Sequence, residues 1–237
     1  MWAGYVADES VKGQSYTEAD MDYFVPCISG TPPNNGEAGM ATWIGLGGRA
    51  TINMIQVGVS AYQSNSFLIY QAFVENTGGT DTGPHNIFPL NCGDHVYVQV
   101  RNGNCMYLQR LNDGKNTGNQ CYGPSHDNQS AQAIAERSSM QPYFANFGTV
   151  TFKGVGITDN AVYRPMGYHP NQVPHYSVEI YQCQWNLDIC GGYDPTPLAT
   201  VGPIQDDPGN TPFDKYAVTW HGYGTPAPSL DPPKAYL

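Results

Sequence analysis

The sequence predicts an all-β protein, either a two-sheet sandwich or a barrel. Its composition is the first observation: 237 residues include 27 glycines, 19 prolines and 17 tyrosines, and only 13% are charged. Such a composition is typical of loop-rich β proteins. Strand-like runs separated by turn signals are the second observation. The third is that no stretch shows a convincing helical pattern and no segment repeats.

The clearest strand lies within residues 51–62, where apolar side chains alternate with Gln56 and Gly58. Residues 94–104 alternate in the same way, and their RNGN ending predicts a hairpin into 105–111. Five further segments have the composition of strands: 41–48, 66–75, 147–154, 175–185 and 214–224. Together these strands are numerous enough for two packed sheets or a closed barrel.

The stretch AQAIAERSS (131–139) is ambiguous because alanine, glutamine and glutamate favour helices. It also alternates, and strands lie on both sides of it, so we predict a strand over 130–137. Its alanines would pack against the other sheet. Gln132, Ile134 and Glu136 would share the opposite face, which aims one carboxylate away from the core.

The chain shows no break in composition that would divide it. We therefore expect one domain over residues 1–225 and a Pro-rich tail at 226–237. The segments 155–175 and 186–213 are rich in glycine and proline, and we interpret them as long connections.

The charge balance argues against nucleic acid as a partner, because a formal charge of -10 does not suit phosphate binding. No apolar run reaches transmembrane length, so we expect no membrane partner. We also predict a monomer. The beginning of the chain does not have the pattern of a signal peptide. If the protein is secreted, as we predict, its signal and any pro-segment have been removed.

Six cysteines in a lysine-poor chain favour disulfides and an oxidising compartment, although six buried thiols are the alternative. Cys183 and Cys190 are close enough in sequence to staple a loop. Cys105 and Cys121 could bridge a hairpin, but the sequence leaves the pairing of all six open.

Motifs for metal or nucleophilic chemistry are missing from the sequence. There is no HExxH, no CxxC and no GxSxG, and the Gly-rich segment 45–50 lacks the lysine of a phosphate loop. We therefore expect no metal and no cofactor.

The chain resembles the eqolisins, a family of acid glutamic peptidases best known from fungi, in which similar motifs read NWAGYV, FTVP, WVGIDG, LQTGVD, SAEWIVEDP and DFGTVTF. The matching stretches occur here in the same order: WAGYV (2–6), YFVP (23–26), WIGLGG (43–48), IQVGVS (55–60), SAQAIAERSS (130–139) and YFANFGTVTFKG (143–154). Each stretch is weak alone, but their order is specific.

The resemblance implies a lectin-like double-sheet sandwich that hydrolyses peptide bonds on its concave face. It places the family's catalytic glutamine at Gln56 and the catalytic glutamate at Glu136. It also implies that Trp2, Trp43 and Tyr70 line the substrate cleft. The expected partners are proteins or peptides.

Several positions depart from the family pattern. The GIDG aspartate is Gly47, the aspartate after QTGV is Ser60, the EWIVE tryptophan is Ala133, and the last two residues of WYEW are Gln71 and Ala72. Because rings and carboxylates of the family are missing, we expect an altered cleft and an altered substrate preference.

Two other functions fit a sandwich of this kind. One is a carbohydrate-binding module without catalysis, since tyrosine and tryptophan rings stack well on sugars. The other is a glycosidase, which normally needs two carboxylates across its cleft. The candidates for a second carboxylate beside Glu136 are Glu75, Asp94 and Glu179.

Overall fold

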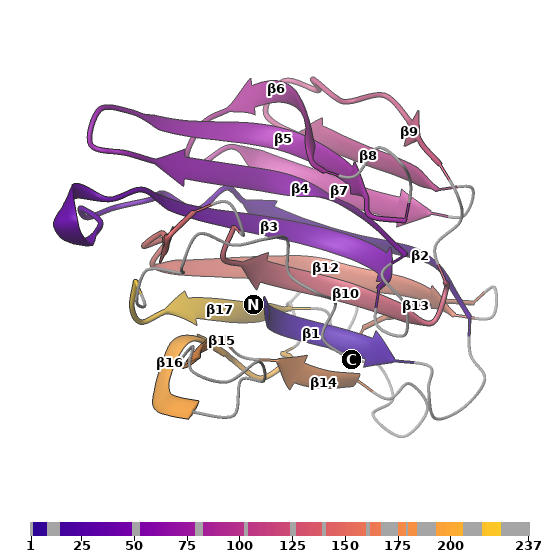
Figure 1. Ribbon diagram of the computed structural model, residues 1–237. Helices are drawn as coiled ribbons and strands as arrows, with labels where there is room; N and C mark the ends of the chain where they lie inside the picture. The colour runs from indigo at the N-terminus through magenta and orange to yellow at the C-terminus, as the bar shows by residue number, and fades with distance from the viewer. Residues whose placement is uncertain are drawn as a thin grey trace.

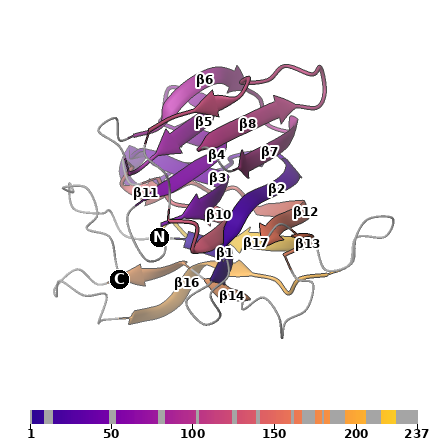
Figure 2. The same ribbon diagram turned by 90° about the vertical axis from the view of Figure 1, so that its right-hand side faces the viewer.

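The computed structural model describes most of the chain and confirms the predicted two-sheet β-sandwich. It describes residues 2–8, 15–48, 53–78, 83–101, 104–123, 127–138, 141–159, 162–166, 175–178, 180–183, 193–205 and 215–223. Figure 1 looks onto the first sheet with the second behind it, and Figure 2 turns the two layers by 90°. Among the described residues, no helix is long and apolar enough to cross a bilayer.

The first sheet has eight strands and carries both segments that the sequence analysis singled out. Its strands, in spatial order, are β14 (His175–Val178), β1 (Trp2–Asp8), β10 (Ser130–Glu136), β3 (Ala38–Gly47), β4 (Met54–Gln63), β5 (Leu68–Asn76) and β6 (His85–Leu90). The short strand β11 (Tyr143–Phe144) pairs with β3 in parallel, and the other pairs are antiparallel. A 3-10 turn, η1 (Pro33–Asn35), precedes β3.

The second sheet has nine strands and lies behind the first in the view of Figure 1. Its strands, in spatial order, are β15 (Ile180–Cys183), β16 (Tyr193–Val201), β17 (Tyr216–Trp220), β12 (Thr149–Asp159), β2 (Tyr16–Phe24), β7 (His95–Arg101), β8 (Cys105–Arg110) and β9 (Gln120–Cys121). The remaining strand, β13 (Val162–Pro165), pairs with β12.

The core lies between the sheets and follows the predicted alternation. On β4, Ile55, Val57 and Val59 are at most 2% exposed and face the second sheet, which contributes the buried valines of β7. Gln56 and Gly58 point to the outer face of the first sheet. The predicted hairpin at RNGN is also confirmed, because β7 and β8 pair up to Arg101 and Cys105.

Within the ambiguous stretch the structure has a strand, β10 (Ser130–Glu136), one residue shorter than the predicted 130–137. Strand β10 pairs with β1 on one side and β3 on the other, and its three alanines are fully buried in the core between the sheets. Ala133 is one of them, so the expectation that it alters the cleft wall was wrong. Its carbonyl oxygen accepts a hydrogen bond from the Tyr216 hydroxyl, and the Tyr216 ring packs against Tyr5. This departure from the family concerns the core.

Two segments differ from the sequence prediction. Residues 175–185 were expected to form one strand, but they form β14 in the first sheet and β15 in the second. Alternation along a segment does not show that the chain crosses between sheets. The segment 186–213 contains β16, whose two prolines, Pro195 and Pro197, are unusual within a strand and favoured the interpretation as a connection. Strands β1, β2 and β6 were not predicted either.

Two disulfides tie the described part of the chain. Cys27 bonds to Cys92, and Cys105 bonds to Cys121 across the β8–β9 pair. The Cys105–Cys121 bond is the bridge that the sequence suggested. Cys190 lies outside the described residues, so its suggested bond to Cys183 stays a prediction.

Gly58 allows β3 and β4 to approach closely at the centre of the first sheet. A Cβ atom at this position would overlap the Thr42 carbonyl oxygen and would lie 2.7 Å from the Trp43 Cα. We expect Gly58→Ala to lower the free energy of unfolding by about 1–3 kcal/mol, because relieving the overlap requires a backbone shift. Urea denaturation measures this. Gly222→Ala is the control, since its Cβ would meet Leu198 at an ordinary 3.6 Å; equal stability of the two variants would contradict the prediction.

Candidate active site

The outer face of the first sheet brings side chains from five strands into register: β1, β10, β3, β4 and β5. One row of directly opposed residues runs from Trp2 through Glu136, Ala41 and Ser60 to Gln71. The next row contains Gly4, Ile134, Trp43, Gly58 and Phe73. A third contains Val6, Gln132, Gly45, Gln56 and Glu75. Glu136 and Gln56 therefore lie diagonally across this face, with Trp43 between them.

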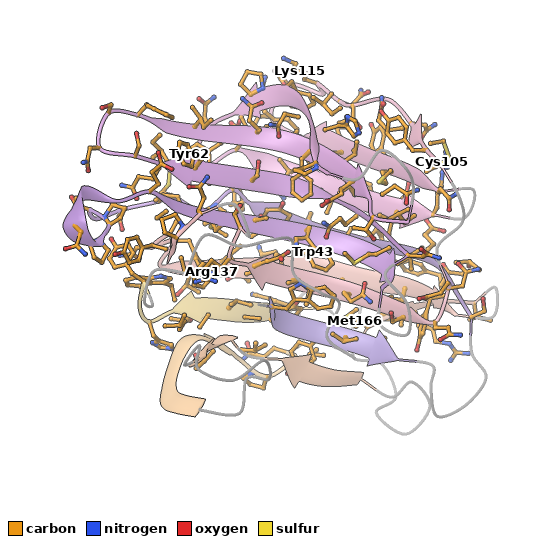
Figure 3. The ribbon with its side chains drawn as sticks, viewed as in Figure 1. Trp43, Tyr62, Cys105, Lys115, Arg137 and Met166 are labelled. Carbon is orange, nitrogen blue, oxygen red and sulfur yellow. A yellow bond between two sulfur atoms is a disulfide. The ribbon has the colours of Figure 1, made fainter. Side chains whose placement is uncertain are left out.

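Trp43 lies between Glu136 and Gln56 and contacts the surroundings of both. Its indole Nε1 donates a 2.8 Å hydrogen bond to Glu136 Oε2, while its ring extends over Gly45, which is paired with Gln56. Trp2 packs edge-on against Trp43, with 5.1 Å between ring centroids. Figure 3 shows Trp43 near the middle of the first sheet. Trp43 has no exposed surface, so the expectation that its ring lines the substrate cleft does not fit its position.

Apolar side chains surround this indole and form the floor of the site. They are Val6, Met54, Phe73 and Ile134, each at most 8% exposed. Glu136 is partly exposed at the edge of this cluster. A carboxylate in such a position keeps access to solvent while much of its surroundings has a low dielectric constant.

The surroundings of Glu136 change its acidity. Burial raises the pKa of its carboxyl above the ordinary value, and this effect outweighs the hydrogen bonding of Trp43 and Trp2 and the charge of Arg137, which act in the opposite direction. A glutamate with a raised pKa can exchange a proton with a substrate in mildly acidic solution.

Gln56 has a partner that the sequence analysis mentioned only as a possible second carboxylate. Glu75 lies directly opposite Gln56 on β5, and the Gln56 Nε2 donates a hydrogen bond to Glu75 Oε2. Gln56 is 6% exposed, and its Oε1 accepts no hydrogen bond within the described part of the chain. The sequence placed Glu75 at the end of the predicted strand 66–75, but only the register between β4 and β5 reveals that it faces Gln56.

A second buried amide extends this row. The Gln132 side chain is fully buried, and its Nε2 donates to Gly47 O and Ser130 Oγ, both at 2.6 Å. Its Oε1 has no hydrogen-bond partner among the described residues. The row therefore presents two amide oxygens and one carboxylate beside the apolar floor.

Tyr70 is not brought to this face. Its side chain lies in the core between the sheets, where its hydroxyl accepts a 2.8 Å hydrogen bond from the Ile28 amide. The expectation that Tyr70 lines the cleft therefore does not fit its position. The outer face of β5 is formed by Gln71, Phe73 and Glu75, because successive strand residues alternate between faces.

The other candidate carboxylates do not join Glu136. Asp94 lies in a loop, where it contacts Arg110 at 3.4 Å, and Glu179 lies outside the described residues. Across the described ranges, no three His, Cys, Asp or Glu side chains are grouped as metal ligands. Glu75 is thus the carboxylate that shares a face with Glu136.

Comparison with known proteins identifies the family. The family model described as the peptidase A4 family matches residues 1–175. The chain belongs to the peptidase A4 family. This is the eqolisin family that the sequence motifs indicated, and membership supports a peptidase function. A search of curated proteins finds no significant match.

Solved structures of eqolisins share the fold. A scytalido-glutamic peptidase with a transition state analog inhibitor aligns with a TM-score of 0.63 and 14% identity, covering 93% of this chain and 98% of that one. SCP-B, an eqolisin in complex with the tripeptide Ala-Ile-His, aligns with a TM-score of 0.59 and 12% identity over 93% and 98% of the two chains. The aspergilloglutamic peptidase from Aspergillus niger gives 0.57 and 17% over 77% and 99%.

Proposed function

We propose that this peptidase A4 member is a secreted acid endopeptidase of the glutamic type, with Glu136 and Gln56 as its catalytic residues. The observation that supports this most directly is the Glu136 carboxylate, held by Trp43 on the face that also bears Gln56. The two disulfides fit an oxidising, extracellular compartment.

In the proposed reaction, ionised Glu136 takes a proton from a water molecule, whose oxygen attacks the carbonyl carbon of the scissile peptide. The carbonyl oxygen becomes an oxyanion, which accepts a hydrogen bond from Gln56 Nε2. Glu136, now protonated, gives its proton to the departing nitrogen. The C–N bond breaks, a new carboxyl and amine leave, and Glu136 is ionised again.

Each of the surrounding residues has a defined part in this proposal. Trp43 orients the Glu136 carboxylate through its indole N–H, and Trp2, which is partly exposed beside it, contacts the substrate. The apolar floor excludes water from the space around the carboxylate. Low dielectric surroundings strengthen both the proton transfer and the hydrogen bond to the oxyanion.

The pH dependence of cleavage tests the proposed function. Burial raises the pKa of Glu136, so its ionised form, which the first step requires, is lost as pH falls through that raised value. We expect a denatured protein substrate to be cleaved in acid, with the acid limb of kcat/KM above the ordinary glutamate pKa of about 4.3. Digestion between pH 2 and 7 measures this. Cleavage that does not fall toward the low-pH end of this range would contradict the role of Glu136, and no cleavage at any of these pH values would favour a binding module.

A further inference from the structure

The amide of Gln56 has to be held in one of two orientations for the proposed function, on which this inference rests. Its Nε2 and Oε1 ends have nearly the same shape, yet only the Nε2 end donates hydrogen bonds. If the amide turned by 180°, an acceptor would face the oxyanion and repel it. A glutamine that serves as an oxyanion donor therefore needs a neighbour that fixes this orientation, either by accepting from its Nε2 or by donating to its Oε1.

Glu75 is that neighbour. The β4–β5 register places it directly opposite Gln56, and its Oε2 accepts a hydrogen bond from Gln56 Nε2. An ionised carboxylate only accepts hydrogen bonds, so it stabilises one orientation of the amide and opposes the other. The NH₂ group has two protons, and the bond to Glu75 leaves the second one available to substrate.

We propose that Glu75 is the positioning residue of the site: it fixes the orientation of the Gln56 amide so that one N–H remains directed at the oxyanion. Glu75 acts through Gln56 and makes no step of the reaction itself. The buried Gln56 Oε1, which has no partner among the described residues, agrees with an amide that is held from its nitrogen end.

The charges around Glu75 connect it to the second catalytic residue as well. The pKa of the Glu75 carboxyl is raised above its ordinary value, mainly by burial. The hydrogen bond from Gln56 and the charge of His85 act to lower this pKa, whereas the negative charge of Glu136 acts to raise it. These groups face it from β4, β10 and β6. Because the repulsion between two carboxylates is mutual, removing the Glu75 charge eases the ionisation of Glu136.

The second sheet contains a matched control. There Gln99 Nε2 donates a 2.5 Å hydrogen bond to Glu18 Oε1 between β7 and β2, on the outer face of that sheet. The donor and acceptor groups are the same, although Gln99 is directly opposite Asp20 and reaches Glu18 diagonally, and the pair lies on the other sheet from Gln56. A Glu18→Gln substitution therefore measures what losing such a pair does to the fold alone.

The experiment compares kcat, KM, melting temperature and pH profile for wild type, Glu75→Gln, Glu75→Leu and Glu18→Gln. Glu75→Gln allows both orientations of Gln56, and Glu75→Leu removes the acceptor. We expect kcat to fall roughly tenfold in the first and about a hundredfold in the second, with KM nearly unchanged, because an oxyanion donor acts in the transition state. The acid limb of Glu75→Gln should move to lower pH. Glu18→Gln should keep the wild-type kcat and profile.

The outcomes separate this inference from the proposed function. If Gln56→Ala and Glu136→Gln are inactive but Glu75→Leu keeps the wild-type kcat, the positioning role is overturned and the peptidase mechanism stands. If Glu75→Gln and Glu18→Gln lose activity equally and in proportion to their melting temperatures, Glu75 is structural and the inference is again overturned. If Gln56→Ala and Glu136→Gln are fully active, the proposed function fails and the inference fails with it.

Discussion

Glu136→Gln is expected to reduce peptide cleavage by at least about 10²–10⁴-fold at every pH, the usual contribution of a general acid–base residue. Glutamine keeps the shape of the side chain, and its Oε1 can still accept the hydrogen bond from Trp43 Nε1. The amide cannot take a proton from water or return one to the leaving nitrogen. The loss should therefore be in kcat, with substrate still bound.

Stability provides the control for this variant. Burial raises the pKa of Glu136, so the folded state carries the charged form at a cost when the pH is above that value. A neutral glutamine removes the cost, and we expect a melting temperature at neutral pH no lower than that of wild type. Cleavage within tenfold of wild type by a folded Glu136→Gln protein would refute the catalytic assignment.

The sequence predicted the faces of β4 and β10 correctly because one face of each strand is rich in small or branched apolar residues. Ile55, Val57 and Val59 could point only to the core, which left Gln56 on the outer face. The alanines of β10 likewise placed Glu136. Where a strand has one apolar face and one mixed face, alternation is sufficient to assign side chains.

Strand β5 shows both a residue that alternation places correctly and a contact that only the structure reveals. Tyr70, Ala72 and Val74 form its apolar face and enter the inter-sheet core, while Gln71, Phe73 and Glu75 form a mixed outer face. Alternation therefore favours a core position for Tyr70, and the cleft position implied by the family resemblance does not fit it. The pairing of Gln56 with Glu75 depends on the β4–β5 register, which neither strand specifies alone.

Loss of the oxyanion donor should have a different kinetic signature from loss of the base. We expect Gln56→Ala to lower kcat by about 10²–10³-fold, equivalent to roughly 3–4 kcal/mol, by analogy with oxyanion-donor deletions in other enzymes. The amide of Gln56 is neutral at all these pH values. Its removal should therefore lower the whole pH profile by one factor and leave the acid limb at the wild-type pH, because that limb reports the ionisation of Glu136.

The pH profiles of kcat for Gln56→Ala and wild type, measured between pH 2 and 7, decide this point. A parallel downward displacement assigns Gln56 to the oxyanion and Glu136 to the proton transfers. A rise in KM with kcat unchanged would instead mean that Gln56 binds substrate and transition state equally, because uniform binding does not lower the barrier from the bound state. In that case Glu136 would have to act without the donor proposed here, and another group would have to stabilise the oxyanion.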